Sequence, residues 1–198
     1  VSSADYTISF NVLANDSDAD GNPLSLVALN GGGALPAYTP ANGIISGSSS
    51  GVVSYTYYQL GAPASDSFTY QVSDGQGGSA TGQVQMTFTT GGESSVTGTI
   101  YAESIFGNSA DNVIVGSGGA DQIDGRGGFD QVWYINSTVG VTVNLATGVN
   151  LYGDAAGDVL LNIEGVSGSG YNDTLTGNAA DNVLYGNNGN DYLSGGAG

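Results

Sequence analysis

Glycine, a polar acid or amide, and an apolar residue return every nine positions in the second half of the chain. The glycines are Gly98, Gly107, Gly116 and Gly125 in a first series and Gly168, Gly177, Gly186 and Gly195 in a second. The sixth position of each complete unit holds Glu103, Asn112, Asp121, Asp130, Asp173, Asn182 and Asp191. A period of nine is too short for a helix pair or a hairpin with its turns. It therefore predicts a glycine-rich loop followed by a very short strand.

Two such units would complete one coil, so loops eighteen residues apart should stack on the same edge. This stacking pairs Glu103 with Asp121, Asn112 with Asp130, and Asp173 with Asp191. After each loop, strand alternation turns one apolar side chain inward, which gives a core barely one residue deep per turn. We therefore expect the stack to need a second source of stability.

Calcium suits the chemistry of these loops. Glycines let the backbone turn tightly and present carbonyl oxygens, and the sixth residue adds a carboxylate. Hard cations take six to eight oxygen ligands, whereas zinc prefers His and Cys, and the chain contains neither residue. The 18 acids face one cationic side chain, Arg126, and the resulting net charge of −17 on 198 residues opposes compaction unless something positive binds. Metal-free, solvated solenoid turns are the alternative interpretation.

Residues 98–133 and 168–198 resemble the hemolysin-type RTX calcium-binding repeat, G-G-x-G-x-D-x-U-x, which folds as a parallel β-roll. The resemblance covers about a third of the chain and implies that the sixth residue gives its carboxylate and that loop residues give carbonyl oxygens. Carried over by position, it implicates Gly116, Gly118, Asp121, Gly125, Gly127, Asp130, Gly186, Asn188 and Asp191, facing loops around Glu103, Asn112 and Asp173. Asn112 and Asn182 replace the acid, so their loops are expected to bind weakly or to cap an array.

Residues 1–90 have a different pattern, with alternating stretches separated by turn-rich segments. The expected strands are Tyr6–Val12, Leu24–Leu29, Val52–Tyr58, Ser67–Val72 and Gly82–Thr89, as in an antiparallel β-sandwich. The stretches 12–24, 66–70 and 72–78 are similar to bacterial cadherin-like, Ig-like domains, which recur as tandem modules in surface adhesins. Residues 91–97 are expected to be a flexible linker. The fold class is therefore all-β, an N-terminal sandwich followed by a C-terminal β-roll.

Asp16, Asp18 and Asp20, followed by Gly21, match the opening of an EF-hand loop. The match is partial because Val27, not Glu, occupies the twelfth position. We keep these acids as candidate calcium ligands, with an Asp-rich surface turn as the alternative. Asp66 and Asp74 are weaker candidates, because a lone Asp in a turn more often bonds its own backbone.

Residues 134–167 break the nine-residue register and are expected to form an irregular insertion in the roll. Within them, Val141–Leu145 alternates as a strand, and the stretch 153–160 recovers the spacing of Gly, Asp and apolar residues. Asp158 is therefore a further candidate ligand. Asp154 and Glu164 are expected to be solvated or local turn acids.

Composition excludes several function classes. Without His or Cys, and with one Arg and no Lys, Ser–His and Cys–His catalysis is excluded within this chain. A pair of carboxylates of the glycosidase kind stays conceivable, but the acids lie in the predicted metal columns, so we expect no enzyme. No transmembrane run occurs, and the acid excess argues against nucleic acid as a partner.

The leading functional hypothesis is a calcium-dependent structural or adhesive module of a secreted or cell-surface RTX protein or fibre. The RTX resemblance implies type I secretion, with folding on calcium after export. Partners left open are neighbouring modules or subunits of the same protein and a surface carbohydrate or protein. The alternative is an accessory region of a secreted exoenzyme whose catalytic domain lies outside this chain. Ice binding would need a flat Thr and Asn ladder, which the loops do not show.

Overall fold

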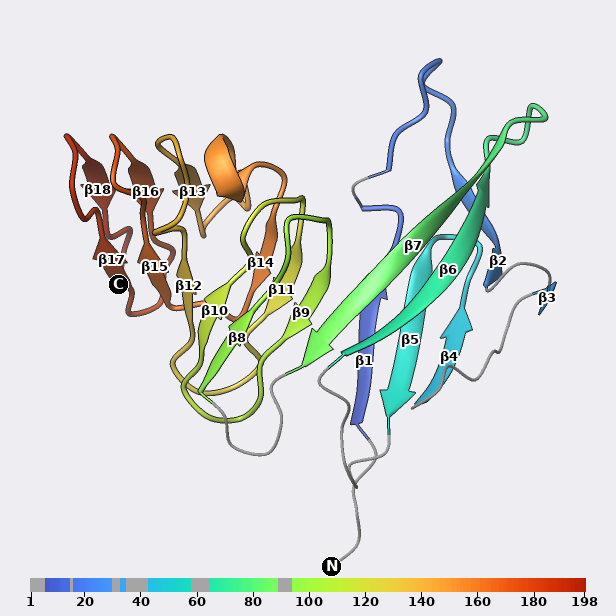
Figure 1. Ribbon diagram of the computed structural model, residues 1–198, viewed down its shortest axis with the longest axis horizontal. Coiled ribbons are helices and arrows are strands. Elements are labelled where there is room, and N and C mark those ends of the chain that lie inside the picture. Colours follow the sequence, from blue (N-terminus) through green and yellow to red (C-terminus); the bar gives the residue numbers. More distant parts are fainter. Residues whose placement is uncertain (1–5, 15, 30–32, 35–42, 58–64, 89–93) are drawn as a thin grey trace, which may run out of the picture. The chain divides into compact units, whose positions relative to one another are not determined.

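The computed structural model describes residues 6–14, 16–29, 33–34, 43–57, 65–88 and 94–198. The chain divides into two compact units, Val1–Gln85 and Met86–Gly198, and each is described by itself. In the described residues, strands make up almost all of the regular structure, and one short 3-10 helix, η1 (Gly153–Ala155), is present (Figure 1). This agrees with the all-β fold class predicted from the sequence.

The N-terminal unit contains two sheets. The first has the order β1-β5-β4 and is antiparallel, and in the second β3, β2, β6 and β7 follow one another. The strands are β1 (Tyr6–Asn11), β2 (Ser25–Leu29), β3 (Gly33–Ala34), β4 (Gly43–Gly47), β5 (Val52–Tyr57), β6 (Ser65–Ser73) and β7 (Ser79–Phe88). Strands β2 and β6 pair antiparallel, with a register shift between Leu26 and Ala28. Two such sheets are the architecture of an Ig-like sandwich.

Apolar side chains alternate along these strands and form the core of the unit. Phe68, Tyr70 and Val72 are buried at every second position of β6, as strand alternation requires. Phe10 of β1 lies against Phe68, with ring centroids 6.3 Å apart and planes inclined by 45°. Tyr55 is fully buried, and its hydroxyl donates to Asp66 Oδ2 at 2.6 Å. Tyr55 is therefore a core residue with a satisfied hydroxyl.

All five predicted strands of the N-terminal region are present, with ends displaced by a few residues; Tyr58 and Thr89 lie outside the described residues. Strands β3 and β4 were not predicted. Strand β4 begins and ends with glycine and is five residues long, so its two isoleucines give too short an alternation to be recognised.

The C-terminal unit is a parallel roll of three-residue strands. One sheet has the order β8-β10-β12-β15-β17. A second sheet has the order β14-β11-β9 and is extended by Met86–Phe88 of β7. A third sheet has the order β13-β16-β18. The strands are β8 (Ser95–Thr97), β9 (Ser104–Phe106), β10 (Val113–Val115), β11 (Gln122–Asp124), β12 (Gln131–Trp133), β13 (Thr142–Asn144), β14 (Val159–Leu161), β15 (Gly165–Ser167), β16 (Thr174–Thr176), β17 (Val183–Tyr185) and β18 (Tyr192–Ser194).

The register of the roll is eighteen residues per turn within each array. Ile123 pairs with Ile105, Val132 with Ile114, and Leu193 with Leu175. The middle residue is buried and its neighbours are partly exposed in β10, β11, β12 and β16, whereas β9 and β15 bury all three residues. The column of buried middle side chains forms the core. The stacking predicted from the nine-residue period is therefore confirmed for the repeats.

The segment 134–167, predicted as an irregular insertion, contributes three strands to the roll. After β12 the chain runs on to β13, which lies beside β16, and then returns to β14, which pairs with β11. Strand β15 then continues the other face beside β12. Val143, Leu160 and Val166 occupy the middle positions although their spacing is not a multiple of nine. The roll tolerates this irregular spacing because only the inward residue of each strand must be apolar.

Strand structure begins within the segment 91–97 that was predicted to be a linker. Ser95–Thr97 forms β8 and pairs in parallel with β10, because Val96 supplies the same single buried side chain as the later strands. Residues 89–93 lie outside the described residues. The division into 1–90 and 98–198 stays a proposal.

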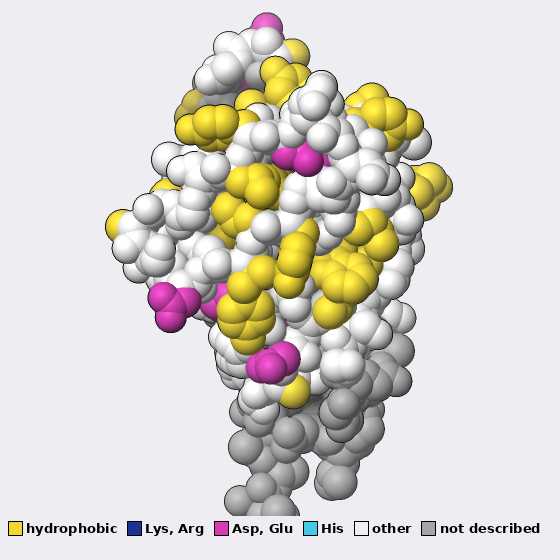
Figure 2. Space-filling model, turned by 90° about the vertical axis from the view of Figure 1, so that its left-hand side faces the viewer, with side chains coloured by type: hydrophobic (Ala, Val, Ile, Leu, Met, Phe, Trp, Pro, Cys, Tyr) yellow, Lys and Arg dark blue, Asp and Glu magenta, His cyan; other side chains and the backbone are white. Residues whose placement is uncertain are grey.

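The last turns of the roll expose apolar side chains. Leu175 is fully buried, whereas the equivalent Leu193 is 47% exposed, and Tyr185 and Tyr192 are exposed as well. Figure 2 shows hydrophobic side chains gathered on the face of the molecule that carries this end. None of the described helices is long and apolar enough to cross a membrane.

Candidate metal centre

The first glycine of each repeat leaves space for oxygen atoms. A Cβ on Gly116 would lie 2.7 Å from Asp121 Oδ2, and one on Gly107 would lie 2.4 Å from both Asn112 Oδ1 and the Gly125 carbonyl oxygen. The glycine thus leaves room for the side chain of the sixth residue in its own loop. At Gly107 it also leaves room for a carbonyl of the next loop in the stack. This arrangement explains why the first position is glycine.

Further along the loop, the backbone adopts positive φ at the second and fourth positions. The second position has φ of 67° at Ser117, 73° at Arg126 and 65° at Asn187. At the fourth position, a Cβ on Gly119 or Gly128 would lie 2.7 Å from backbone atoms of the loop eighteen residues earlier. Stacked loops are therefore in close backbone contact, and only glycine fits there.

The sixth residues form columns, as predicted. The backbone N–H groups of Glu103, Asn112 and Asp173 donate to one carboxylate oxygen of the residue eighteen positions later. The acceptors are Asp121 at 2.9 Å, Asp130 at 2.8 Å and Asp191 at 2.9 Å. The three predicted pairs are thus brought together by direct hydrogen bonds.

Several carboxylate oxygens in these columns lack a hydrogen-bond partner although they are buried. Glu103 Oε1, Asp121 Oδ2 and Asp130 Oδ2 have none in the described structure, and the three residues are at most 4% exposed. A buried charged oxygen without a donor is costly. These three oxygens therefore point to an absent positive ligand.

The electrostatics of the column lead to the same conclusion. Burial, together with the facing carboxylates of Asp158 and Glu103, raises the pKa of Asp121 to about 9. Burial also raises the pKa of Asp130 to about 6. Because a nearby cation favours the charged form of an acid, binding a divalent ion would lower the free-energy cost of ionising these buried carboxyl groups.

The donor set fits calcium. All available donors are carboxylate, amide and carbonyl oxygens, which hard cations prefer. Among the described residues, no cluster of three or more Asp, Glu, His or Cys side chains could hold a metal by itself. A cation here would therefore need backbone carbonyls besides the sixth residue. The residues predicted from the repeat to contribute them are Gly116, Gly118, Gly125, Gly127, Gly186 and Asn188.

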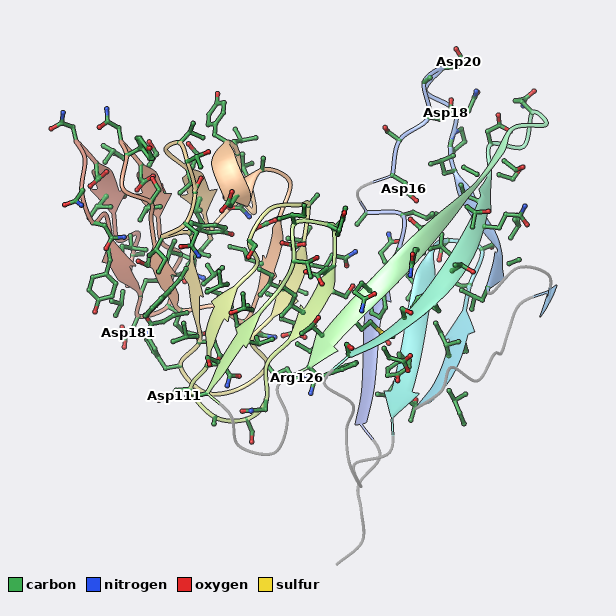
Figure 3. All side chains as sticks on the ribbon, viewed as in Figure 1. Asp16, Asp18, Asp20, Asp111, Arg126 and Asp181 are labelled. Atoms are coloured by element: carbon green, nitrogen blue, oxygen red, sulfur yellow. The ribbon has the colours of Figure 1, made fainter. Side chains whose placement is uncertain are left out.

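The two asparagines at the sixth position close their own loops. Asn112 Oδ1 accepts from Asn108 N at 2.8 Å, and Asn182 Oδ1 accepts from Asn178 N at 2.7 Å. The acids one place earlier, Asp111 and Asp181, are exposed and lie outside the columns (Figure 3). Asn112 and Asn182 therefore keep the shape of the loop but lower its charge.

Asp158 takes its predicted place in the column but is already bonded. Its Oδ1 accepts from Asp121 N at 2.9 Å, and its Oδ2 accepts from the buried Tyr134 hydroxyl at 2.8 Å. Burial, together with Asp158, raises the pKa of Tyr134 well above its usual value, so this hydroxyl keeps its proton. Asp158 is therefore a weaker candidate ligand than Asp121.

Glu164 was missed by the sequence analysis, which treated it as a solvated or turn acid. The structure places it in the column with Asp130, because Glu164 Oε2 accepts from Asp130 N at 2.9 Å. The signal that could have found it is its spacing to the next strand. Glu164-Gly165-Val166 repeats the order of acid, variable residue and buried apolar residue seen at Asp121-Gln122-Ile123.

The acids of the predicted loop in the N-terminal unit form hydrogen bonds within the protein. Asp18 Oδ1 accepts from the backbone N–H groups of Asp20 and Asn22, and Asp16 Oδ2 accepts from the Tyr70 hydroxyl at 2.9 Å. The Asn22 N–H holds the pKa of Asp18 below its usual value. The three acids are spread along the loop between β1 and β2 rather than around one point (Figure 3). Their role as calcium ligands stays a prediction, with the Asp-rich turn as the alternative.

The two weaker candidates in this unit also form protein contacts. Asp74 Oδ1 accepts from the backbone N–H groups of Gln76 and Gly78, as expected of a turn acid. Asp66 accepts from Ser67 N and from the Tyr55 hydroxyl.

Comparison with known families agrees with this division of the chain. Residues 1–87 match the family of bacterial Ig domains, and residues 97–132 and 167–198 match the RTX calcium-binding nonapeptide repeat. No curated protein matches the chain. RTX repeats bind calcium and are typical of secreted proteins. The chain therefore combines a bacterial Ig domain with RTX calcium-binding repeats that form a β-roll.

Proposed function

We propose that this chain is a calcium-dependent structural or adhesive module of a secreted or cell-surface protein or fibre, whose roll folds on binding calcium after export. The observation that carries the proposal is the set of buried carboxylate oxygens without partners, on Glu103, Asp121 and Asp130. These oxygens lie on the stacked edges of loops that match a calcium-binding repeat.

The proposed ligand groups are the sixth residues and the carbonyls of the loops around them. Asp121 and Asp130 each use one oxygen to fix the preceding loop and keep the other free, so one side chain serves both the backbone and an ion. The acids Glu103, Asp173 and Asp191 occupy the same column position. The bound ion would supply the positive charge that offsets repulsion between neighbouring carboxylates.

The stabilisation expected from such binding is large for a thin core. A site with a Kd of about 10⁻⁴ M, typical of extracellular calcium modules, gives roughly 2.7 kcal/mol when free calcium is about 100 times the Kd. Several sites together rival the total stability of a domain. At sub-micromolar calcium the same expression gives almost nothing, so the roll would stay unfolded inside a calcium-poor cell.

The adhesive or fibre role is favoured over the alternative of an exoenzyme accessory region because an Ig domain shares the chain with the repeats. Such a module would use neighbouring modules, or a surface carbohydrate or protein, as partners. Neither matched family is catalytic. Tandem modules in the native polypeptide would favour the first role, and a catalytic domain would favour the second.

Calcium titration followed by circular dichroism tests the folding step. The β-signal should fall in excess chelator and return on adding calcium. Asp121→Ala should weaken calcium binding at least tenfold. Asp154→Ala should weaken it less, because Asp154 is not one of the paired acids of the column. An unchanged β-signal in chelator would refute coupled folding, and equal effects of the two variants would refute the assignment of the column.

A further inference from the structure

The turn Asn162–Glu164 takes the place of a nonapeptide loop next to the loop Gly125–Asp130. In the repeats, the N–H of the first glycine donates to the carbonyl of the residue just before the next loop of the stack. Gly107 N, for example, donates to the Asp124 carbonyl at 2.8 Å, and Asp124 precedes the loop that begins at Gly125. Gly125 donates in the same way to the Leu161 carbonyl at 3.0 Å. A three-residue turn outside the repeats thus continues the stack.

Asn162 presents its carbonyl oxygen where a repeat presents that of its first glycine. A Cβ on Gly125 would lie 2.4 Å from the Asn162 carbonyl oxygen and 2.6 Å from Asp130 Oδ2, as one on Gly107 would meet Gly125 O and Asn112 Oδ1. Both oxygens therefore border the same small space. Asn162 reaches this position with φ of 52° and donates its side-chain amide to Asp124 Oδ1 at 2.7 Å.

Glu164 fills the sixth position of this shortened loop. It accepts from Asp130 N at 2.9 Å, just as Asp130 accepts from Asn112 N at 2.8 Å. The Glu164 carbonyl also accepts as a sixth residue does in the repeats. Val183 N donates to it at 3.0 Å, as Gln131 N donates to the Asn112 carbonyl at 2.8 Å. Glu164 therefore brings a second carboxylate to the edge that Asp130 borders.

The independent sign of a ligand is Asp130 Oδ2. This oxygen is buried without a hydrogen-bond partner in a residue that is 1% exposed, and it faces the space beside Gly125 that the Asn162 carbonyl also borders. Uncompensated negative charge among oxygen atoms alone selects a hard cation.

We propose that Asp130 Oδ2, the Asn162 carbonyl and the Glu164 carboxylate form part of a calcium site that lies outside the nonapeptide repeats. The inference rests on the proposed function, since it assumes that the acid columns bind calcium. It adds one ion between the first array and the segment that follows it. The site would tie β14 and β15 to the loop before β12, so the cation column would continue where the repeat pattern stops.

The test is a count of bound calcium by native mass spectrometry, with affinity measured by isothermal titration. Glu164→Gln keeps an oxygen that can accept from Asp130 N but removes the charge. We expect the variant to bind one ion fewer, or to bind that ion at least tenfold more weakly, since losing even an outer-shell partner costs about 10- to 100-fold. Asp181→Asn makes the same charge change at an exposed acid outside the column and should leave the count unchanged.

The outcomes separate this inference from the function on which it rests. A wild-type chain that binds no calcium overturns the proposed function and this site with it. A wild-type chain that binds calcium, with Glu164→Gln equal to wild type in number and affinity, overturns this site alone. Should the variant fail to fold, a crystal structure of the wild-type protein with calcium decides. An ion within about 2.3–2.6 Å of oxygens from Asp130, Asn162 and Glu164 supports the site, and density without such an ion overturns it.

Discussion

The two units of this chain bury different chemistry. In the described part of the Ig domain the buried core is apolar, with side chains such as Phe10, Leu26, Ile45 and Phe68. The buried acids and amides of the described residues all lie in the roll, at Glu103, Asn112, Asp121, Asp130, Asn150, Asp158 and Asp173. The first unit can thus be stabilised by apolar burial alone, whereas the second buries carboxylates whose negative charge a bound cation would offset.

This difference follows from the width of each fold. The sandwich faces two sheets across a core, so a strand such as β6 contributes three large side chains. Strands of the roll such as β10 and β11 are three residues long and bury only their middle side chain. A narrow coil therefore needs bonds along its edges, and the oxygen-lined loops provide them if metal binds.

Removing calcium should produce the largest contrast between the units. In excess chelator, residues 98–198 should lose protection from hydrogen exchange, because several sites worth roughly 2.7 kcal/mol each would be lost together. Residues 6–88 should keep their protection. Hydrogen exchange measured by mass spectrometry on the whole chain resolves the two regions. Equal protection of the roll with and without calcium would break the comparison.

A cavity in the sandwich should affect stability without involving calcium. Phe68→Ala removes a ring that is 2% exposed and packs against Phe10, and such a change costs about 3–5 kcal/mol. Thermal unfolding should show a lower transition for the Ig domain, shifted equally with and without calcium. The calcium-binding isotherm should match that of wild type. A weakened isotherm would show that the Ig domain supports the metal sites.

The sequence predicted the repeats well because each repeat carries its own signals. Gly116, Asp121 and Ile123 recur at fixed offsets, and the same offsets fix the loop, the column and the core. The column position of Glu164 and the pairing of β14 were not predicted, since both depend on a chain excursion that returns to pair with β11. Asp16 and Asp18 differ from the repeats. Their spacing matched a metal loop, but a tyrosine hydroxyl and local N–H groups became their partners.

Acidity should distinguish the units by a smaller effect of opposite sign. In the calcium-free roll the pKa values of Asp130 and Asp158 are raised to about 6 by burial, above the value of about 3.9 expected when unfolded. Their neutral forms favour folding, so this stability is fully present below about pH 4 and is lost as the pH rises through 6. Asp18 in the Ig domain has a lowered pKa, so its contribution is lost as the pH falls.

Calcium-free protein should therefore hold more roll structure at pH 5 than at pH 7, by about 1 kcal/mol per group. Denaturant unfolding at the two pH values, with exchange protection read separately for residues 6–88 and 98–198, measures this. With saturating calcium the roll should behave in the reverse way, because protons then compete with the ion for the same oxygens. A calcium-free roll that weakens on acidification would mean that its buried carboxylates already have adequate partners within the protein.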